Sequence, residues 1–143
     1  MKLKKYTHKV QYYETDQMKI VHHSNYIRWY EEARSDFLEQ IGCSYESIEE
    51  TRIISPVIAV TCEYRNMTRY GETVEIIPKV LSFNGVKFEL SYEIRNVETK
   101  ELKVTGTSKH CFLNEQGRPI SLKRSAPELF KKLEEAKNLD YDS

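Results

Sequence analysis

The sequence predicts an α+β fold, in which one long apolar helix accompanies an antiparallel sheet. Between Tyr26 and Ile41, apolar residues recur at steps of three and four, the period of a helix. From Ile53 onward the apolar period changes to two, which is typical of strands. The strand segments follow one another closely, so we expect most of them to pair as a meander.

The predicted helix is unusually apolar. Ser24 or Asn25 can cap its first turn, and Gly42 stands where a glycine commonly follows a helix end. Apolar residues occupy more than one side of the helix, which indicates that the sheet wraps around it. These residues are Tyr26, Ile27, Trp29, Tyr30, Ala33, Phe37, Leu38 and Ile41.

Strands are expected at residues 10–12, 58–64, 73–83, 86–95 and 102–113, with a short helical turn at residues 45–50. Pro78 predicts a sheet edge or a bulge, because proline cannot donate to a strand ladder. Asn84-Gly85 predicts a hairpin with a type I′ turn. Residues 125–128 read as a capping box that opens a final helix.

Composition indicates one domain over residues 1–143, without a linker or repeat. Twenty-two basic and twenty-two acidic residues cancel, so no overall field attracts nucleic acid or an anionic membrane. The apolar stretches are too short to span a bilayer, and no apolar signal segment follows the basic start. Three cysteines without a CxxC motif fit the reducing cytoplasm, where we expect the protein to reside.

The segment from residue 12 to residue 26 carries the clearest chemistry. Asp16 falls in a loop before the helix, where a carboxylate can act as base or nucleophile. The free N–H groups of a helix start can stabilise an oxyanion, so the pair would suit acyl transfer. Judged on the residues alone, an aspartate before a helix is more often a turn or capping residue than a catalytic one.

Neither a metal nor a cofactor is predicted. His22 and His23 are adjacent on the predicted helix start and point in different directions. His8 and His110 share no ligand spacing with them, so a zinc site is not expected. The sequence also lacks a P-loop, a GxGxxG motif and a G-x-S-x-G elbow.

Residues 13–34, YETDQMKIVHHSNYIRWYEEAR, closely resemble the signature of the 4-hydroxybenzoyl-CoA thioesterase family of hot-dog proteins. The likeness continues through residues 64–72, 82–83 and 118–120, and so extends over nearly the whole chain. It implies a hot-dog fold, an antiparallel five-stranded sheet wrapped around a long central helix. It also implies dimers joined at sheet edges and active sites at the dimer interface. The open edges of the expected sheet, together with such an interfacial site, predict a homo-oligomer, a homotetramer built as a dimer of dimers.

The resemblance assigns roles to individual residues. Asp16 would attack the thioester or activate water, and the backbone N–H of His23 would bind the thioester oxygen. The His23 side chain would orient substrate or water, with helix-start packing or capping as the open alternative. Glu32 and Arg34 would form a polar pair within the helix or between subunits. Contacts to the substrate are expected from Val21, His22, Asn25, Tyr26, Arg65 and Arg69. Four basic residues at predicted strand ends or turns are candidates for the coenzyme A phosphates, with solvated surface charge as the open alternative for each: Arg65, Arg69, Lys123 and Arg124.

The function implied is hydrolysis of an acyl-CoA thioester, or of a thioester on acyl-carrier protein. Two alternatives remain open: a hydratase or dehydratase on the same fold, and a non-catalytic acyl-thioester binding module. Lys19 departs from the family pattern, because many relatives have glycine there. Glycine permits unusual backbone angles or close approach of a ligand, so Lys19 leaves the acyl preference open.

Overall fold

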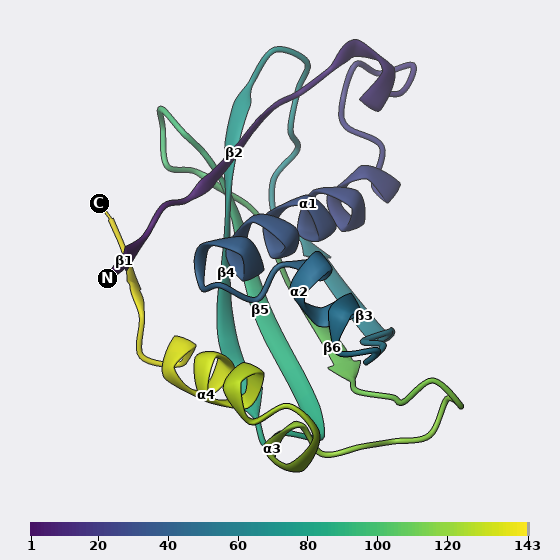
Figure 1. Cartoon of the computed structure of the whole chain (residues 1–143). Helices are drawn as coiled ribbons and strands as arrows, with labels where there is room; N and C mark the ends of the chain where they lie inside the picture. Colours follow the sequence, from purple (N-terminus) through teal and green to yellow (C-terminus); the bar gives the residue numbers. More distant parts are fainter. Residues whose placement is uncertain (143) are drawn as a thin grey trace.

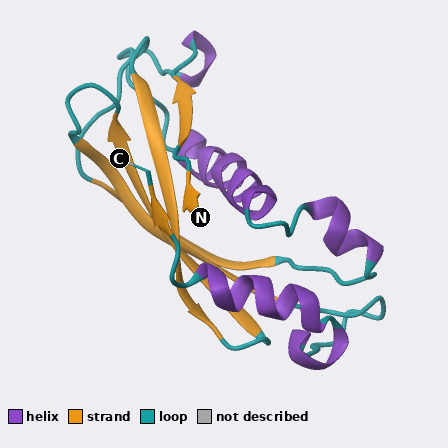
Figure 2. Cartoon of the chain, turned by 60° about the vertical axis from the view of Figure 1, so that its left-hand side comes forward, coloured by secondary structure: helices purple, strands orange, loops and turns teal. Residues whose placement is uncertain are grey.

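A curved five-stranded antiparallel sheet forms the body of the protein, in a computed structural model that describes residues 1–142 (Figure 1). Its strands lie in the order β2 (Tyr6–Lys9), β4 (Thr73–Phe83), β5 (Lys87–Asn96), β6 (Leu102–Cys111) and β3 (Val57–Tyr64). Helix α1 (Ser24–Gln40) lies along the concave face, with the other helices on the same side (Figure 2). The α+β prediction, with the sheet curved around one long helix, is confirmed.

Short elements complete the chain. A 3-10 turn, η1 (Tyr12–Glu14), follows β2, and α2 (Tyr45–Glu50) follows α1. Helices α3 (Leu122–Ser125) and α4 (Pro127–Ala136) cover the end of the sheet where β4 turns into β5. Strands β1 (Lys2–Leu3) and β7 (Asp140–Tyr141) pair in parallel and bring the two chain ends together. Within the described residues, no helix has the length and apolar character needed to cross a membrane.

The core lies between α1 and the sheet. Trp29 and Tyr30 of α1 are almost completely buried, and the Tyr30 ring stacks on Tyr92 of β5 with centroids 4.1 Å apart. Gly106 of β6 permits this packing, because a Cβ atom there would collide with the Tyr30 hydroxyl and the Thr61 carbonyl. The buried apolar residues of the strands face the same interior: Val74, Ile76, Leu90, Tyr92, Ile94 and Val104.

The two ends of α1 differ in how well the sequence predicts them. At the C-terminal end, Gly42 has a φ of +81° and donates to the Glu39 carbonyl, while Cys43 donates to Leu38. This is a Schellman motif, so the predicted glycine stop is confirmed. At the N-terminal end the predicted cap is wrong: His23 is the cap residue without a capping side-chain bond, and Ser24 and Asn25 are already helical.

Two other local predictions are wrong. The first strand of the five-stranded sheet is Tyr6–Lys9 rather than residues 10–12, because residues 12–14 turn back as η1. The capping box at residues 125–128 does not form, since Ser125 ends α3 and Ala126 caps α4 without a side-chain hydrogen bond. Pro127 is the first residue of α4. An N–H at this position has no acceptor within the helix, so the N–H that proline lacks costs no helical hydrogen bond.

The β4–β5 hairpin forms as predicted, but its turn differs from the prediction. Three residues, Asn84–Val86, connect the strands, and the Asn84 side-chain oxygen accepts from the Val86 and Lys87 N–H groups. Only Gly85 has a positive φ, whereas a type I′ turn requires two such residues. Pro78 lies beyond Ile76, the last residue of β4 that pairs with β2, so it is at the sheet edge as predicted and its missing N–H costs no bond to β2. The Tyr141 hydroxyl covers this edge and donates to the Pro78 carbonyl.

Candidate active site

A tight turn presents Asp16 between η1 and α1. The Asp16 N–H donates to the Ile20 carbonyl at 2.8 Å, and the Lys19 N–H donates to the Asp16 carbonyl at 2.9 Å. Lys19 has a φ of +63°, in the left-handed region that glycine adopts most easily. Lys19 therefore adopts the backbone angle that the glycine of many relatives would adopt, and its side chain is exposed.

Glu14 fixes the start of this loop through hydrogen bonds of its buried side chain. Its side chain is buried and accepts hydrogen bonds from the His8 ring, the Gln11 N–H and the Trp29 indole N–H at 2.7–2.8 Å. Burial alone would raise the pKa of Glu14, but these hydrogen bonds outweigh burial and lower its pKa. Glu14 thus remains a carboxylate that ties β2, the loop and α1 together.

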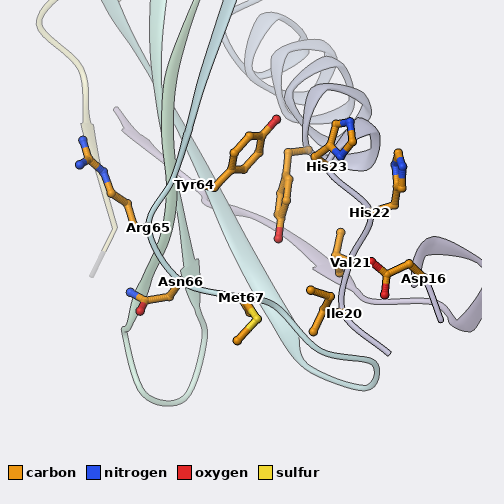
Figure 3. A pocket seen from close by; sticks show the side chains of 10 residues that line it. Asp16, Ile20, Val21, His22, His23, Tyr64, Arg65, Asn66 and Met67 are labelled. Carbon is orange, nitrogen blue, oxygen red and sulfur yellow. The ribbon is translucent and has the colours of Figure 1, made fainter. Parts of the chain in front are cut away.

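Asp16 lines a pocket of about 280 Å³ at the N-terminal end of α1. In Figure 3 the Asp16 carboxylate is turned toward Val21 and Ile20. Its Oδ1 accepts a hydrogen bond from the Met18 N–H at 2.8 Å, whereas Oδ2 has no partner within residues 1–142. One carboxylate oxygen therefore fixes the side chain, and the other is left for chemistry. The complete lining is Asp16, Ile20, Val21, His22, His23, Tyr26, Tyr64, Arg65, Asn66 and Met67.

The backbone N–H groups at the start of α1 are almost all occupied. Ser24 donates to Nδ1 of the His22 ring at 3.2 Å, Asn25 donates to the His22 carbonyl at 3.0 Å, and Tyr26 donates to the His23 carbonyl at 3.4 Å. Because Ser24 N–H is a donor, the neutral His22 ring carries its proton on Nε2. The His23 N–H has no hydrogen-bond partner within the described residues, so it is free to bind a substrate oxygen.

Aromatic rings form one wall of the pocket. Tyr26 and Tyr64 lie with ring centroids 5.5 Å apart, and the His22 and His23 rings stack at 4.1 Å. The Tyr26 hydroxyl donates to the Thr68 hydroxyl at 3.1 Å, and the Thr68 carbonyl accepts the Val21 N–H. Thr68 is completely buried and fastens both sides of the pocket, a role for which the sequence gives no signal.

The structure brings together most, but not all, of the residues expected at the site. Asp16, Val21, His22, His23, Tyr26 and Arg65 line the pocket. Arg69 does not line it, and Lys123 and Arg124 lie on α3, at the opposite end of the sheet from the pocket (Figure 1). Asn25 is buried behind the helix start, where its side chain binds backbone carbonyls.

Glu32 and Arg34 do not pair with each other within the chain. The Glu32 carboxylate accepts from the Tyr6 hydroxyl at 3.2 Å and lies 3.5 Å from the His8 ring. Arg34 is buried; its Nε donates to the Tyr45 hydroxyl, and it lies 3.5 Å from the Glu31 carboxylate. Two residues apart, the side chains point to different sides of α1, which explains why no pair forms.

Metal binding finds no support among residues 1–142, where no group of three or more His, Cys, Asp or Glu side chains is arranged to hold an ion. His22 and His23 stack on each other instead of converging on a common point.

Comparison with known proteins identifies the class. The chain matches the Thioesterase-like superfamily over residues 10–135, and it belongs to that family. The curated relative "Putative acyl-CoA thioesterase YneP" of Bacillus subtilis is 35% identical over 129 residues, 90% of this chain and 93% of the relative. The acyl-CoA thioester hydrolase YbgC of Escherichia coli is 27% identical over 123 residues, covering 86% of this chain and 92% of that protein.

Among solved structures, the DHNA-CoA thioesterase from Staphylococcus aureus superposes with a TM-score of 0.86 at 32% identity, covering 92% of this chain and 89% of that one. The predicted hot-dog fold is therefore confirmed, as is the thioesterase class at the level of the family. Membership of the 4-hydroxybenzoyl-CoA branch stays a prediction.

Proposed function

We propose that this protein hydrolyses acyl-CoA thioesters to a free acid and coenzyme A. One observation carries the proposal: a carboxylate oxygen of Asp16 and the N–H of His23, both without hydrogen-bond partners within residues 1–142, belong to residues that line one pocket. A base or nucleophile facing an oxyanion donor is the arrangement that acyl transfer requires. The relatives named as acyl-CoA thioesterases support the same assignment.

The chemistry follows from these two groups. Asp16 either takes a proton from water that adds to the thioester carbon, or adds to that carbon itself and forms an anhydride. In both cases the carbonyl oxygen becomes an oxyanion, which the His23 N–H stabilises. Collapse breaks the C–S bond and expels the thiolate of coenzyme A, and water hydrolyses the anhydride where one has formed. The His23 side chain orients the substrate or the water.

Pocket residues supply contacts to the substrate. Val21, Ile20 and Met67 offer apolar surface to the acyl group, and His22 and Tyr26 add aromatic surface. Arg65 also lines the pocket, but its guanidinium pairs with the Glu63 carboxylate and donates to the Thr105 hydroxyl, so a phosphate of coenzyme A would have to displace Glu63 to bind it. Asn25, Arg69, Lys123 and Arg124 lie outside the pocket of one subunit, so direct contact from them requires a larger bound ligand or a second subunit.

The proposed assembly is a homo-oligomer, a tetramer formed as a dimer of dimers. Strand β3 pairs only with β6, which leaves its other edge open. Val57, Ile58 and Tyr64 on this strand are 38%, 49% and 53% exposed, an unusual amount of apolar surface for an edge. Because Tyr64 also lines the pocket, pairing of β3 edges would place the pocket beside a subunit interface. Light scattering tests this assembly, and a fully active monomer at micromolar concentration would contradict it.

A panel of acyl-CoA esters incubated with the purified protein tests the activity, with free thiol as the readout. We expect thiol release from at least one ester in proportion to enzyme concentration. A hydratase or dehydratase would consume enoyl or hydroxyacyl esters without releasing thiol, and a binding module would retain the esters unchanged. The same esters on acyl-carrier protein distinguish the two carriers. The three cysteines are free thiols in the structure, which supports the proposed cytoplasmic location.

A further inference from the structure

Asn25 occupies an unexpected place for a polar residue beside an active site. Its side chain is only 6% exposed and does not line the pocket. The side-chain Nδ2 donates to two backbone carbonyls, that of Glu14 at 2.9 Å and that of His22 at 3.3 Å. The Asn25 backbone N–H adds a second bond to the His22 carbonyl at 3.0 Å. One residue therefore holds the His22 carbonyl with two donors.

A held carbonyl also determines where the next N–H points. The peptide between His22 and His23 is planar and trans, so its C=O and N–H point in opposite directions. Because Asn25 draws the His22 carbonyl toward the buried side, the His23 N–H is directed away from Asn25. It has no partner of its own within residues 1–142, and His23 lines the pocket.

The same bonds prevent this peptide from rotating. The His22 N–H donates to the Glu14 carbonyl at 2.8 Å, so the Glu14 carbonyl joins His22 and Asn25. The Glu14 side chain is itself held by His8 and Trp29. Rotation of the His22–His23 peptide would leave buried donors of Asn25 without acceptors, which is costly.

We propose that Asn25 is a positioning residue, which aims the His23 N–H at the oxygen of the bound thioester. This inference rests on the proposed hydrolysis and assigns Asn25 a role other than contact with substrate. An oxyanion donor is effective only when it is already directed at the position where charge develops. Asn25 supplies that direction without touching the substrate.

Asn25→Ala removes the side-chain bonds to both carbonyls and leaves the His22 carbonyl with the backbone N–H of residue 25 alone. We expect kcat to fall about 10²-fold, toward the loss seen when an oxyanion donor is removed, while KM changes less than about threefold. Asn25→Ser keeps one side-chain donor, so its kcat should lie between those of the wild type and Asn25→Ala. The serine variant also allows the test if the alanine variant does not fold. Asn114→Ala is the matched control. The Asn114 side chain also fastens a loop, through the Gln116 and Arg118 N–H groups, but Asn114 does not line the pocket.

A second measurement does not depend on turnover. Crystal structures should show the His22–His23 peptide rotated in Asn25→Ala and unchanged in Asn114→Ala. Equal kcat losses in the two variants, or an unrotated peptide in Asn25→Ala, would overturn the positioning role. Wild-type protein that releases no thiol from any ester would instead refute the proposed hydrolysis. The rotation of the His22–His23 peptide would still test whether Asn25 holds that peptide in place.

Discussion

Replacement of Asp16 by asparagine is the most direct test of the proposed chemistry. In the structure, Asp16 Oδ1 accepts the Met18 N–H, and an asparagine Oδ1 can accept the same bond. Oδ2 has no partner within residues 1–142, so the new NH2 group breaks no hydrogen bond of the described structure. We therefore expect the free energy of unfolding to change by less than about 0.5 kcal/mol, as for other surface substitutions. Activity should fall about 10²–10⁴-fold, because an amide neither accepts a proton nor forms an anhydride.

The assay is steady-state thiol release on the best ester, beside thermal melting of the same preparation. Asp36→Asn is the matched control, because Asp36 also accepts one hydrogen bond, from Gln40 at 2.8 Å, but does not line the pocket. We expect this control to retain turnover. If Asp16→Asn melts normally and keeps near-normal turnover, Asp16 has only the turn role that its hydrogen bond to Met18 already shows.

Three further predictions concern metal, backbone strain and pH. Thiol release should survive EDTA, and activity that EDTA abolishes and zinc or magnesium restores would contradict the proposed mechanism. Lys19→Gly should stabilise the fold by up to about 1 kcal/mol, since φ at this position is +63°, whereas Gln17→Gly in the same turn should not; melting curves of both variants test this. Burial, followed by the charge of Arg34, lowers the pKa of His110 to about 4. An unfolded chain then binds a proton that the folded one does not, so the free energy of unfolding should fall by about 3 kcal/mol between pH 7 and pH 4 from this residue. Denaturant titrations should show a smaller loss over this pH range in His110→Gln than in the wild type.

Periodic patterns predicted the fold because they report burial, and burial governs these elements. Residues of β5 alternate between buried and partly exposed along nearly their whole length, so a period of two was visible in the sequence. The α1 residues that face the sheet recur at helical spacing for the same reason. Gly42 was predictable because a left-handed residue after a helix is a local requirement.

Local patterns failed where a distant partner decides the structure. The start of α1 has neither a serine nor an asparagine cap, because the His22 ring takes the Ser24 N–H and Asn25 turns to carbonyls of the loop. The parallel pair β1 and β7 joins residues from opposite ends of the chain, which no sequence window contains. Asn84 takes no positive φ, since its side chain closes the hairpin in another way.

The site was only partly predictable for a similar reason. Asp16 was a candidate from its place before the helix, but its catalytic role and that of His23 were predicted only through a family resemblance, because an isolated aspartate before a helix is usually a turn residue. Asn25 was expected to contact substrate, whereas its buried side chain binds two carbonyls. Glu14 and Thr68 carry no sequence signal, although hydrogen bonds to both residues fix the pocket.

The arrangement of hydrogen bonds separates the residues that support the site from those that can react. Glu14, Asn25 and Thr68 are buried and hydrogen-bonded to other parts of the chain, so they supply rigidity. The Tyr30 hydroxyl is the one buried side-chain polar atom without a partner within residues 1–142, yet it is enclosed by packing and out of reach of a substrate. Asp16 Oδ2 and the His23 N–H are also without partners, but their residues line an open pocket. Accessibility together with unused bonding capacity, rather than either property alone, is the reason why we propose Asp16 and His23 as the reacting groups.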